Sequence, residues 1–513
     1  MFNFIGLPKS SNLNITGSPV YFMQPLFSTL IAIDKQAKQP VYLQIANRLA
    51  ELVRDSSLQP GYRLPGSRQL AELLNINRQT VVQAYDELLA QGWFESRTGS
   101  GTFVTAHLPI AQRQQLAAGQ TSPFNAALTA GFTFKKTPHL QRSIVQNKSK
   151  LHLDDGFPDA RFAPLEELSR AYRSQLLEGD PYVRLGYGDN LGSKWLRQVL
   201  AGYLNDTRGL KITWRNIIIT RGTVMGVYLA CTSFLQPGDN VVTGTISWGG
   251  ASMNFQQAGA NIIKIQADEH GLVIDELEAL CKKVTIRMVY VTSHHHYPTT
   301  VALRADRRLQ LLNLAKQYGF IIFEDDYDYD FHYLSKPLAP LASADTAGMV
   351  LYCGSFTKTV SPAFRVGYLV ASEDAITQLG LLRRIIDRQG DTMLENAMAQ
   401  LLQAGSIQRQ IRKALKSYRQ RRDIFCQLLT QHLGDVVKFN IPDGGMAVWA
   451  QFDPKIDLVT LSEKALAKGL HMPVGLWKDE ETNLNAFRLG FASSTPEELE
   501  QCVEILAGII KGG

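Results

Sequence analysis

Residues 320–328 read FIIFEDDYD, in which four apolar residues run directly into a string of acids. Continuous apolar runs of this kind are typical of parallel strands that are buried on both faces of a sheet. Their alternation with helical stretches predicts an α/β fold with helices on both sides of a mostly parallel sheet. Ligands of such sheets lie beyond the carboxyl ends of the strands, so the residues after each run are the candidates for chemistry. Four further runs stand at 217–219, 240–242, 288–291 and 349–352.

The composition limits the class of protein. The chain has 513 residues, of which 45% are apolar and 19% charged, which is ordinary globular composition. This length predicts about three domains, or one small and one large domain. The longest apolar stretch, 20–33, is short and interrupted by polar residues, so no membrane span is expected. Five widely spaced cysteines indicate neither a disulfide framework nor a metal pair, and we expect a cytoplasmic protein. Residues 1–35 are an N-terminal extension in which Met23 is an alternative start.

Residues 36–104 have the pattern of a small DNA-binding domain. Residues 40–56 place apolar side chains at helical spacing, a second helix starts at Ser67 as its N-cap, and Asn77 caps a third. Two short strands then flank the glycine-rich turn at 97–101. This order predicts a winged helix-turn-helix, an α+β domain that binds DNA. The domain has seven basic and six acidic residues, so a three-helix protein-interaction module is the alternative.

The start of the third helix supplies the candidates for base contacts. In a helix-turn-helix this end enters the major groove, where arginine pairs with guanine and glutamine with adenine. The run 64–104 resembles the DNA-binding domain of GntR-type bacterial regulators, through its LPGSR, RQTV and GSGTFV segments. The resemblance implies DNA contacts from Arg63, Arg68, Arg78, Gln79, Thr80 and the wing at Gly99 and Gly101.

Residues 105–150 separate this domain from the large one. They have weak periodicity, contain three prolines, and carry six basic residues and no acidic one. Such a segment is typical of a solvated linker, and a linker that lies against DNA phosphates is the alternative. The basic residues are Arg113, Lys135, Lys136, Arg142, Lys148 and Lys150.

The residues that follow the strand runs fit the needs of one cofactor. Gly222 and Thr223 begin a helix whose free N–H groups can bind phosphate, and Lys358 lies in GSFTK after the fifth run. Pyridoxal 5′-phosphate requires a lysine for a Schiff base, an aspartate for its ring nitrogen and donors for its phosphate. The acids at 324–330 are not a calcium loop, because no glycine follows Asp330. The residues predicted to fill the cofactor roles are Lys358, Asp325, Gly222, Thr223, Ser355 and Arg365.

The region 151–513 resembles fold-type I aminotransferases, through DDGFPDARFAP, YGDNLGSKWLRQVLAGYL, IIITRGT, YPT, IIFEDDYD, GSFTK and FRLGFA. With the GntR-like domain and the basic linker before it, the chain is similar to the MocR subfamily of transcription regulators. The resemblance implies that Lys358 binds the cofactor and that Asp325 and Tyr327 contact its ring nitrogen and phenolic oxygen. It further implies that Trp248 stacks on the ring, that Tyr187 reaches the partner's phosphate in a homodimer, and that Arg488 holds an amino-acid carboxylate.

Two positions depart from the family pattern. Gly250 stands where the GABA-responsive member has an arginine, which argues against GABA as the effector. Thr300 replaces the usual glycine of the Pro-Ser/Thr-Gly segment, which is expected to change one wall of the pocket. The run 294–296, three histidines, has the residue type for a metal site, but its place before YPT favours a pocket wall.

These observations predict a homodimeric, pyridoxal-phosphate-dependent regulator that senses an amino compound by external aldimine formation and changes its DNA binding in response. A working aminotransferase with an appended DNA-binding domain is the first alternative. A plain repressor whose large domain only dimerises is the second, and a regulator for which pyridoxal phosphate itself is the signal is the third.

Overall fold

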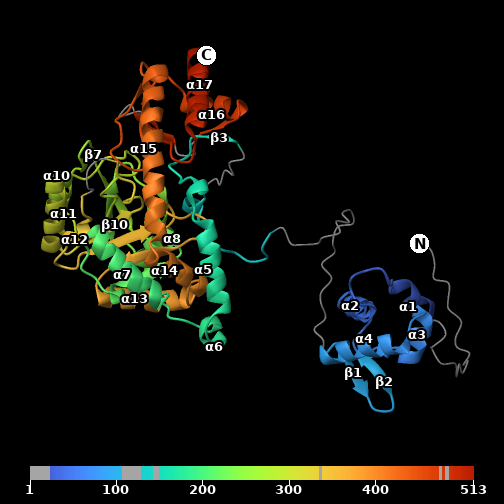
Figure 1. Ribbon diagram of the computed structural model, residues 1–513. Helices are drawn as coiled ribbons and strands as arrows, with labels where there is room; N and C mark the ends of the chain where they lie inside the picture. The colour runs from blue at the N-terminus through green and yellow to red at the C-terminus, as the bar shows by residue number, and fades with distance from the viewer. Residues whose placement is uncertain are drawn as a thin grey trace, which may run out of the picture. The chain divides into compact units, whose positions relative to one another are not determined.

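The computed structural model describes residues 24–106, 129–141, 149–333, 338–472, 476–479 and 484–512. The chain divides into two compact units, Met1–Thr133 and Phe134–Gly513 (Figure 1). Met23 and three basic residues of the expected linker, Arg113, Arg142 and Lys148, lie outside the described residues. No helix in the described ranges is long and apolar enough to cross a membrane.

The first unit has the predicted order of helices followed by a hairpin, which confirms the winged helix-turn-helix. Asn77 caps the third expected helix, because its side chain accepts a hydrogen bond from the Gln79 backbone at 2.8 Å. The expected cap at Ser67 is wrong: Gly66 is the N-cap and Ser67 is the first helical residue. The elements are α1 (Gln24–Leu30), α2 (Val41–Arg54), α3 (Ser67–Leu74), α4 (Arg78–Ala90), β1 (Phe94–Arg97) and β2 (Gly101–Val104).

A single apolar core holds the first unit together. Leu49 of α2 and Val81 of α4 are fully buried in it. Phe27 of α1 and Ile31 just after this helix are 1% and 3% exposed in the same core. Residues of the segment 1–35 that the sequence leaves as an extension therefore pack with the DNA-binding domain.

The second unit is built on a seven-stranded sheet of order β4-β12-β11-β10-β9-β5-β6, which confirms the predicted α/β fold. Its strands are parallel except for β12, which is antiparallel to both of its neighbours. All five expected runs are strands; the sequence analysis missed β6, an edge strand with polar residues, and β12, a run of four residues. The strands are β4 (Ile217–Thr220), β5 (Asn240–Gly244), β6 (Asn261–Ile265), β9 (Met288–Val291), β10 (Ile321–Asp326), β11 (Val350–Ser355) and β12 (Gly367–Val370).

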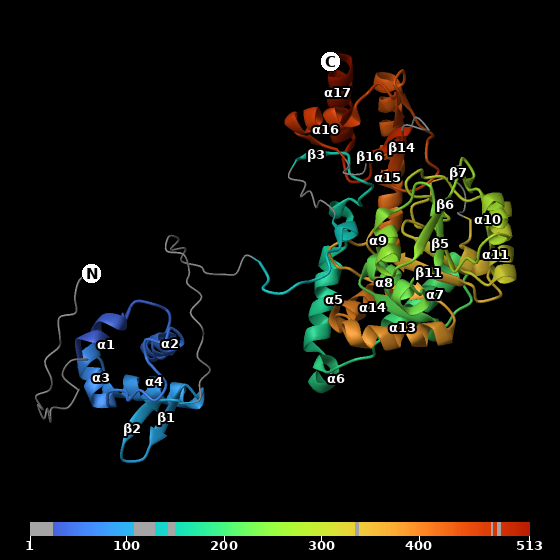
Figure 2. The same cartoon turned by 180° about the vertical axis from the view of Figure 1, so that it is seen from behind.

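Helices cover both faces of this sheet. Because side chains alternate along a strand, Ile217 and Ile219 of β4 point into one core and Ile218 into the other. The face of Ile218 is covered by α8 (Gly222–Phe234), α9 (Gly249–Gln257) and α13 (Glu373–Ile386), with α8 and α9 side by side (Figure 2). The other face is covered by α5 (Leu165–Leu177), α7 (Lys194–Arg208), α10 (Ile274–Cys281), α11 (Ala305–Tyr318), α12 (Leu341–Ala344) and α14 (Thr392–Gln403). The short helix α6 (Pro181–Leu185) follows α5.

The C-terminal part of the second unit has a core of its own around an antiparallel sheet of order β13-β14-β17-β16. The long helix α15 (Ser406–Leu433) runs from α14 to this sheet (Figure 1). The strands are β13 (Val437–Lys438), β14 (Ala447–Phe452), β16 (Leu476–Asp479) and β17 (Leu484–Gly490), and the helices beside them are α16 (Leu458–Ala467) and α17 (Pro496–Gly512). The hairpin β7 (Ala267–Asp268) and β8 (Gly271–Leu272) lies outside both larger sheets.

The chain enters this C-terminal core directly after the linker. Strand β3 (Leu151–His152) pairs in parallel with β15 (Leu470–His471). Two residues later, the carbonyl oxygen of Asp154 accepts a hydrogen bond from the backbone N–H of Gly490 at 2.7 Å. These bonds hold residues 154–157 next to β17, although more than 300 residues separate them in the sequence.

Candidate functional site

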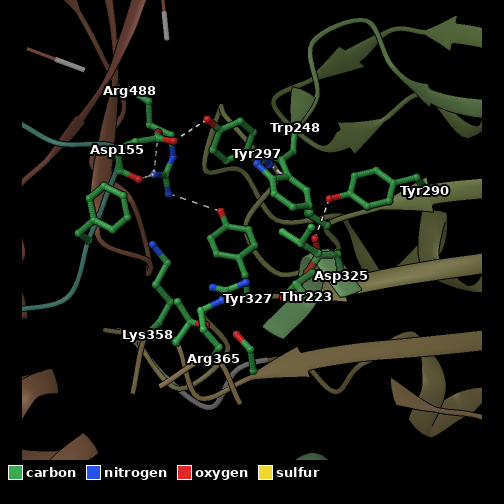
Figure 3. Close-up of a pocket in the computed structure, with 15 residues that line it drawn as sticks. Asp155, Thr223, Trp248, Tyr290, Tyr297, Asp325, Tyr327, Lys358, Arg365 and Arg488 are labelled. Atoms are coloured by element: carbon green, nitrogen blue, oxygen red, sulfur yellow. Dashed lines mark hydrogen bonds and ion pairs between the residues drawn. The ribbon is translucent and has the colours of Figure 1, made fainter. Parts of the chain in front are cut away.

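A pocket of about 240 Å³ opens at the carboxyl ends of β9, β10 and β11, the edge of the sheet that the sequence indicates. It contains eight of the predicted site residues, namely Thr223, Trp248, Asp325, Tyr327, Ser355, Lys358, Arg365 and Arg488 (Figure 3). The other lining residues are Asp155, Phe157, Val224, Tyr290, Thr292, Tyr297 and Thr357. Tertiary structure thus brings residues from eight separate segments together.

Asp325, the next-to-last residue of β10, is held by a tyrosine. The Tyr290 hydroxyl donates to its Oδ2 at 2.7 Å, while the buried Oδ1 has no partner among the described residues. Burial raises the pKa of Asp325 to about 7, even though the hydrogen bond from Tyr290 lowers it. A cationic N–H donor at Oδ1 would stabilise the ionised form, so this oxygen is suited to a protonated ring nitrogen.

Lys358 lies three residues after β11 and points into the pocket (Figure 3). Its Nζ donates to the carbonyl oxygen of Gly156 at 2.6 Å and lies 4.9 Å from the ring centroid of Phe157. Burial and the neighbouring Arg488 lower the pKa of Lys358. A lowered pKa increases the neutral fraction of the amine, which is the form that attacks a carbonyl carbon.

Gly222, Thr223, Ser355 and Arg365 form a cradle for an anion. Gly222 opens α8 with φ +73°, and a Cβ there would lie 2.7 Å from Nη2 of Arg365. Glycine therefore lets the guanidinium lie against the helix start, where the first backbone N–H groups have no acceptor within the helix. Two hydroxyls, the N–H groups and a guanidinium make this end of the pocket suited to a phosphate.

Trp248 is the N-cap residue of α9, and its ring lines the pocket. A Cβ at Gly250 would lie 2.4 Å from this ring. The indole therefore fills the space that a side chain at position 250 would need. An arginine at position 250, as in the GABA-responsive family member, would therefore require the ring of Trp248 to move.

Arg488 of β17 and Asp155 form the opposite end of the pocket (Figure 3). Arg488 Nη1 donates to the carbonyl oxygen of Asp155 and lies 3.3 Å from its Oδ1, and Nη2 lies 3.5 Å from the Tyr327 hydroxyl. The Tyr297 hydroxyl donates to Asp155 Oδ2 at 2.7 Å. Burial alone lowers the pKa of Arg488, but Tyr327 and Asp155 raise it above its ordinary value. The guanidinium therefore stays charged inside the protein.

Asp155, Tyr290 and Tyr297 line the pocket but are not among the predicted site residues, although features of the sequence point to each of them. Tyr290 is the one hydroxyl-bearing residue of the buried strand MVYV, and a buried hydroxyl needs a partner. Asp155 and Tyr297 lie in stretches that the family resemblance covers, DDGFPDARFAP and YPT, but no role was assigned to them. Their positions in the pocket depend on contacts between elements that are distant in sequence.

Tyr187 and the three histidines do not line the pocket of this chain. Tyr187 is 79% exposed, and its ring centroid lies 3.9 Å from the guanidinium carbon of Arg388. The pocket-wall interpretation of residues 294–296 is wrong, because these buried rings bond to Leu338, Asp328 and Thr299. Among the described residues, no group of three or more His, Cys, Asp or Glu is placed to hold a metal.

Thr300 does not line the pocket either, which corrects the expectation that it changes a wall. Its φ is +65°, in the left-handed region that favours glycine. Its backbone N–H donates to the carbonyl oxygen of His296 at 2.7 Å. This left-handed backbone at position 300 explains why the family usually has glycine there.

In the first unit, the predicted DNA-contacting residues lie at the starts of α3 and α4, on the hairpin, and in the segment before α3 that pairs with it. Arg78 and Gln79 are the first two residues of α4 and are exposed, while Thr80 is half-buried. Arg63 pairs with Phe103 of β2, beside the wing. Arg68, in α3, and the wing glycines Gly99 and Gly101 are also exposed.

Comparisons with known proteins agree with this division. The family model "Aminotransferase class I and II" matches residues 150–506, and the model "Bacterial regulatory proteins, gntR family" matches residues 41–104. The chain is 28% identical to the uncharacterized HTH-type transcriptional regulator YdfD of Bacillus subtilis, over 93% of this chain and 98% of the relative. It is 24% identical to the probable rhizopine catabolism regulatory protein MocR of Rhizobium meliloti, over 93% and 95%.

Solved structures match the second unit. The multiple substrate aminotransferase of Thermococcus profundus is 26% identical, with a TM-score of 0.66 over 74% of this chain and 97% of that one. The kynurenine aminotransferase of Pyrococcus horikoshii is also 26% identical, with a TM-score of 0.64 over 71% and 92%.

Proposed function

The chain belongs to the class I and II aminotransferase family and carries a gntR-family DNA-binding domain, and on this premise we propose that it is a transcription regulator that senses an amino compound. Pyridoxal phosphate is the cofactor of its large domain. One observation supports the proposal: side chains of the types that this cofactor needs, Asp325, Lys358 and Arg365 among them, line one pocket of a chain whose other unit matches the gntR-family model.

The residues of the pocket fit this cofactor. The unpartnered Oδ1 of Asp325 would hold the ring nitrogen, and the cradle of Gly222, Thr223, Ser355 and Arg365 would hold the phosphate. Trp248 would cover the ring. Pyridoxal phosphate supplies an aldehyde that condenses reversibly with primary amines.

Lys358 links ligand binding to the segment that follows the linker. Lys358, whose pKa is lowered, would hold the cofactor through Nζ, and Arg488 would orient the ligand. When Nζ is not bonded to the cofactor it can donate to the carbonyl oxygen of Gly156, as it does in this structure. Gly156 lies four residues after β3, where the chain enters from the linker. Ligand exchange would therefore change the contacts of this segment, which is the differential interaction a switch requires.

The test is DNA binding by the Lys358→Ala variant in the presence and absence of amines. The proposal predicts that the variant still binds DNA but that its affinity no longer changes when an amine is added. The same response in wild type and variant would refute the role of Lys358.

A working aminotransferase is the second candidate function. It is supported by the intact set of Lys358, Asp325 and Arg488 in one pocket. Keto-acid formation measured over many turnovers distinguishes the two, because a sensor binds its ligand without sustained turnover.

We also propose that the regulator is a homodimer. Large apolar side chains are exposed on α6, in the first half of α8 and in the second half of α13. Helix α8 packs against α13, and Tyr187, two residues after α6, lies against Arg388, two residues after α13. Such patches are typical of protein interfaces, and this one borders the pocket because Val224 belongs to both. A second copy on this face would bring its own Tyr187 near the pocket edge. The patch consists of Tyr182, Val183, Leu185, Tyr187, Val224, Tyr228, Leu381, Ile385 and Ile386.

Light scattering with size-exclusion chromatography tests the dimer. Ile385→Glu, at a side chain that is 82% exposed, should give monomers. Leu309→Glu is the matched control, because Leu309 is 60% exposed on α11, outside the patch, and this variant should remain dimeric. A dimeric Ile385→Glu protein would place the interface elsewhere.

A further inference from the structure

Asp155 places a carboxylate at the ligand end of the pocket. Its side chain is 34% exposed, and both of its oxygens already have partners, Tyr297 for Oδ2 and Arg488 for Oδ1. A carboxylate has about four acceptor sites, so further donors can still bind it. The remaining charged residues that line the pocket, Asp325, Lys358 and Arg365, serve the cofactor in the proposed function.

A ligand at this end of the pocket meets both Arg488 and Asp155. The buried Nε of Arg488 has no partner among the described residues, so a ligand carboxylate can bind this guanidinium while Asp155 Oδ1 stays 3.3 Å from Nη1. Two carboxylates would then share one cation and leave an excess negative charge. A simple amino acid would bind Arg488 only against this repulsion. A ligand that carries a second cationic group would neutralise the excess negative charge.

The aromatic rings at this end favour the same ligand. Phe157, Tyr297 and Tyr327 all line the pocket. In this structure their faces already lie near cations, with Lys358 Nζ 4.9 Å from the centroid of the Phe157 ring and the Arg488 guanidinium 5.2 Å from that of Tyr297. Aromatic faces beside a carboxylate attract ammonium and guanidinium groups.

We propose that the pocket selects a basic amino acid, whose primary amine goes to the cofactor, whose carboxylate goes to Arg488 and whose second cationic group goes to Asp155. The inference rests on the proposed sensing function and specifies its ligand class. It assigns Asp155 as a residue that determines specificity.

The experiment is a titration of the full-length, cofactor-loaded protein, followed by its visible absorption. The probes are two pairs of matched side-chain length, L-lysine with L-norleucine and L-ornithine with L-norvaline. In wild type the basic member of a pair should reach half-saturation at a concentration about ten to a hundredfold lower. In Asp155→Asn the difference should fall to within about threefold. Asp306→Asn is the matched control, because Asp306 pairs with Arg304 in an exposed site, and this variant should keep the wild-type preference.

Three results would overturn the inference. If norleucine and norvaline bind wild type as tightly as their basic counterparts, the ligand class is wrong while the sensing function stands. If Asp155→Asn keeps the full preference, another group makes the selection. If no amine changes the spectrum of the loaded protein, the proposed sensing function fails together with the inference.

Discussion

The anion cradle makes a quantitative prediction at Gly222. Replacing Gly222 by Ala adds a Cβ that would lie 2.7 Å from Nη2 and 2.9 Å from Cζ of Arg365. These atoms are the far end of a flexible side chain, so the protein should fold with Arg365 displaced. A charge-assisted hydrogen bond to phosphate is worth about 1.5–3 kcal/mol, so the Kd for pyridoxal phosphate should rise about ten to 150-fold.

The control separates this clash from backbone strain. Gly319 has φ +74°, almost the same as the +73° of Gly222, but a Cβ there meets no atom within 4 Å. Both Ala variants should lose about 1–2 kcal/mol of stability because of the left-handed backbone. Gly319→Ala should nevertheless bind the cofactor as wild type does. Titration with pyridoxal phosphate, followed by absorption, gives the Kd of each variant. Equal Kd values for the two variants would refute the phosphate-binding role of the cradle.

Three further predictions concern other parts of the chain. Tyr290→Phe should raise the pKa of Asp325 above about 7. The pKa of Asp325 in the folded protein already lies above its ordinary value of 3.8, so the cofactor-free fold loses stability as pH rises from about 4 to about 7. In Tyr290→Phe the ionised carboxylate also lacks its hydrogen bond. The free energy of urea unfolding should therefore fall by about 1.5–3 kcal/mol relative to wild type, and by more at pH 8 than at pH 5. An equal loss at both pH values would contradict this. Phe27→Ala should lower the free energy of unfolding of the first unit by about 3–5 kcal/mol. Thermal melting should show this as a lower Tm for that unit, with the cofactor absorbance unchanged. An unchanged Tm would show that Phe27 does not contribute to this core. Arg78, at the start of α4, is expected to contact a base, and Arg68, at the start of α3, a phosphate. Arg78→Ala should therefore relax base preference at one position of a selected DNA site, whereas Arg68→Ala should weaken all sites alike and lower the salt dependence. The reverse pattern in binding assays would exchange these two roles.

The residues at the strand ends were predictable because of a general property of parallel sheets. The carboxyl ends of parallel strands lie at one edge of the sheet, so Asp325 and Lys358 were expected at the same edge once their runs were identified as strands, and the pairing of β10 with β11 then brings them close. Trp248 and Arg488 were placed in the pocket only through the family resemblance. Their spacing in the sequence carries no such signal.

Asp155 illustrates a residue whose position in the pocket no local sequence pattern shows. It reaches the pocket because β3 pairs with β15 and Gly490 bonds to Asp154, contacts that join segments more than 300 residues apart. The antiparallel strand β12 was missed because GYLV is too short to show a period. The histidines at 294–296 were misplaced because their ring partners come from other loops, which a local pattern does not reveal.

The Ser67 cap shows a local limit of the same kind. Serine is favoured at an N-cap, but Gly66 has the extended conformation of the cap residue, with φ −60° and ψ 151°. Ser67 instead accepts a hydrogen bond from the side chain of Arg78 at 3.4 Å.

A joint titration of ligand and DNA binding tests whether ligand exchange at the pocket is coupled to DNA binding. The cofactor-loaded protein is titrated with basic amino acids while visible absorption and the fluorescence anisotropy of a DNA site, selected from a random pool, are recorded in the same sample. The account predicts that both signals change with the same midpoint and that the anisotropy change is absent in Lys358→Ala. A change in absorption with constant DNA affinity would contradict the account.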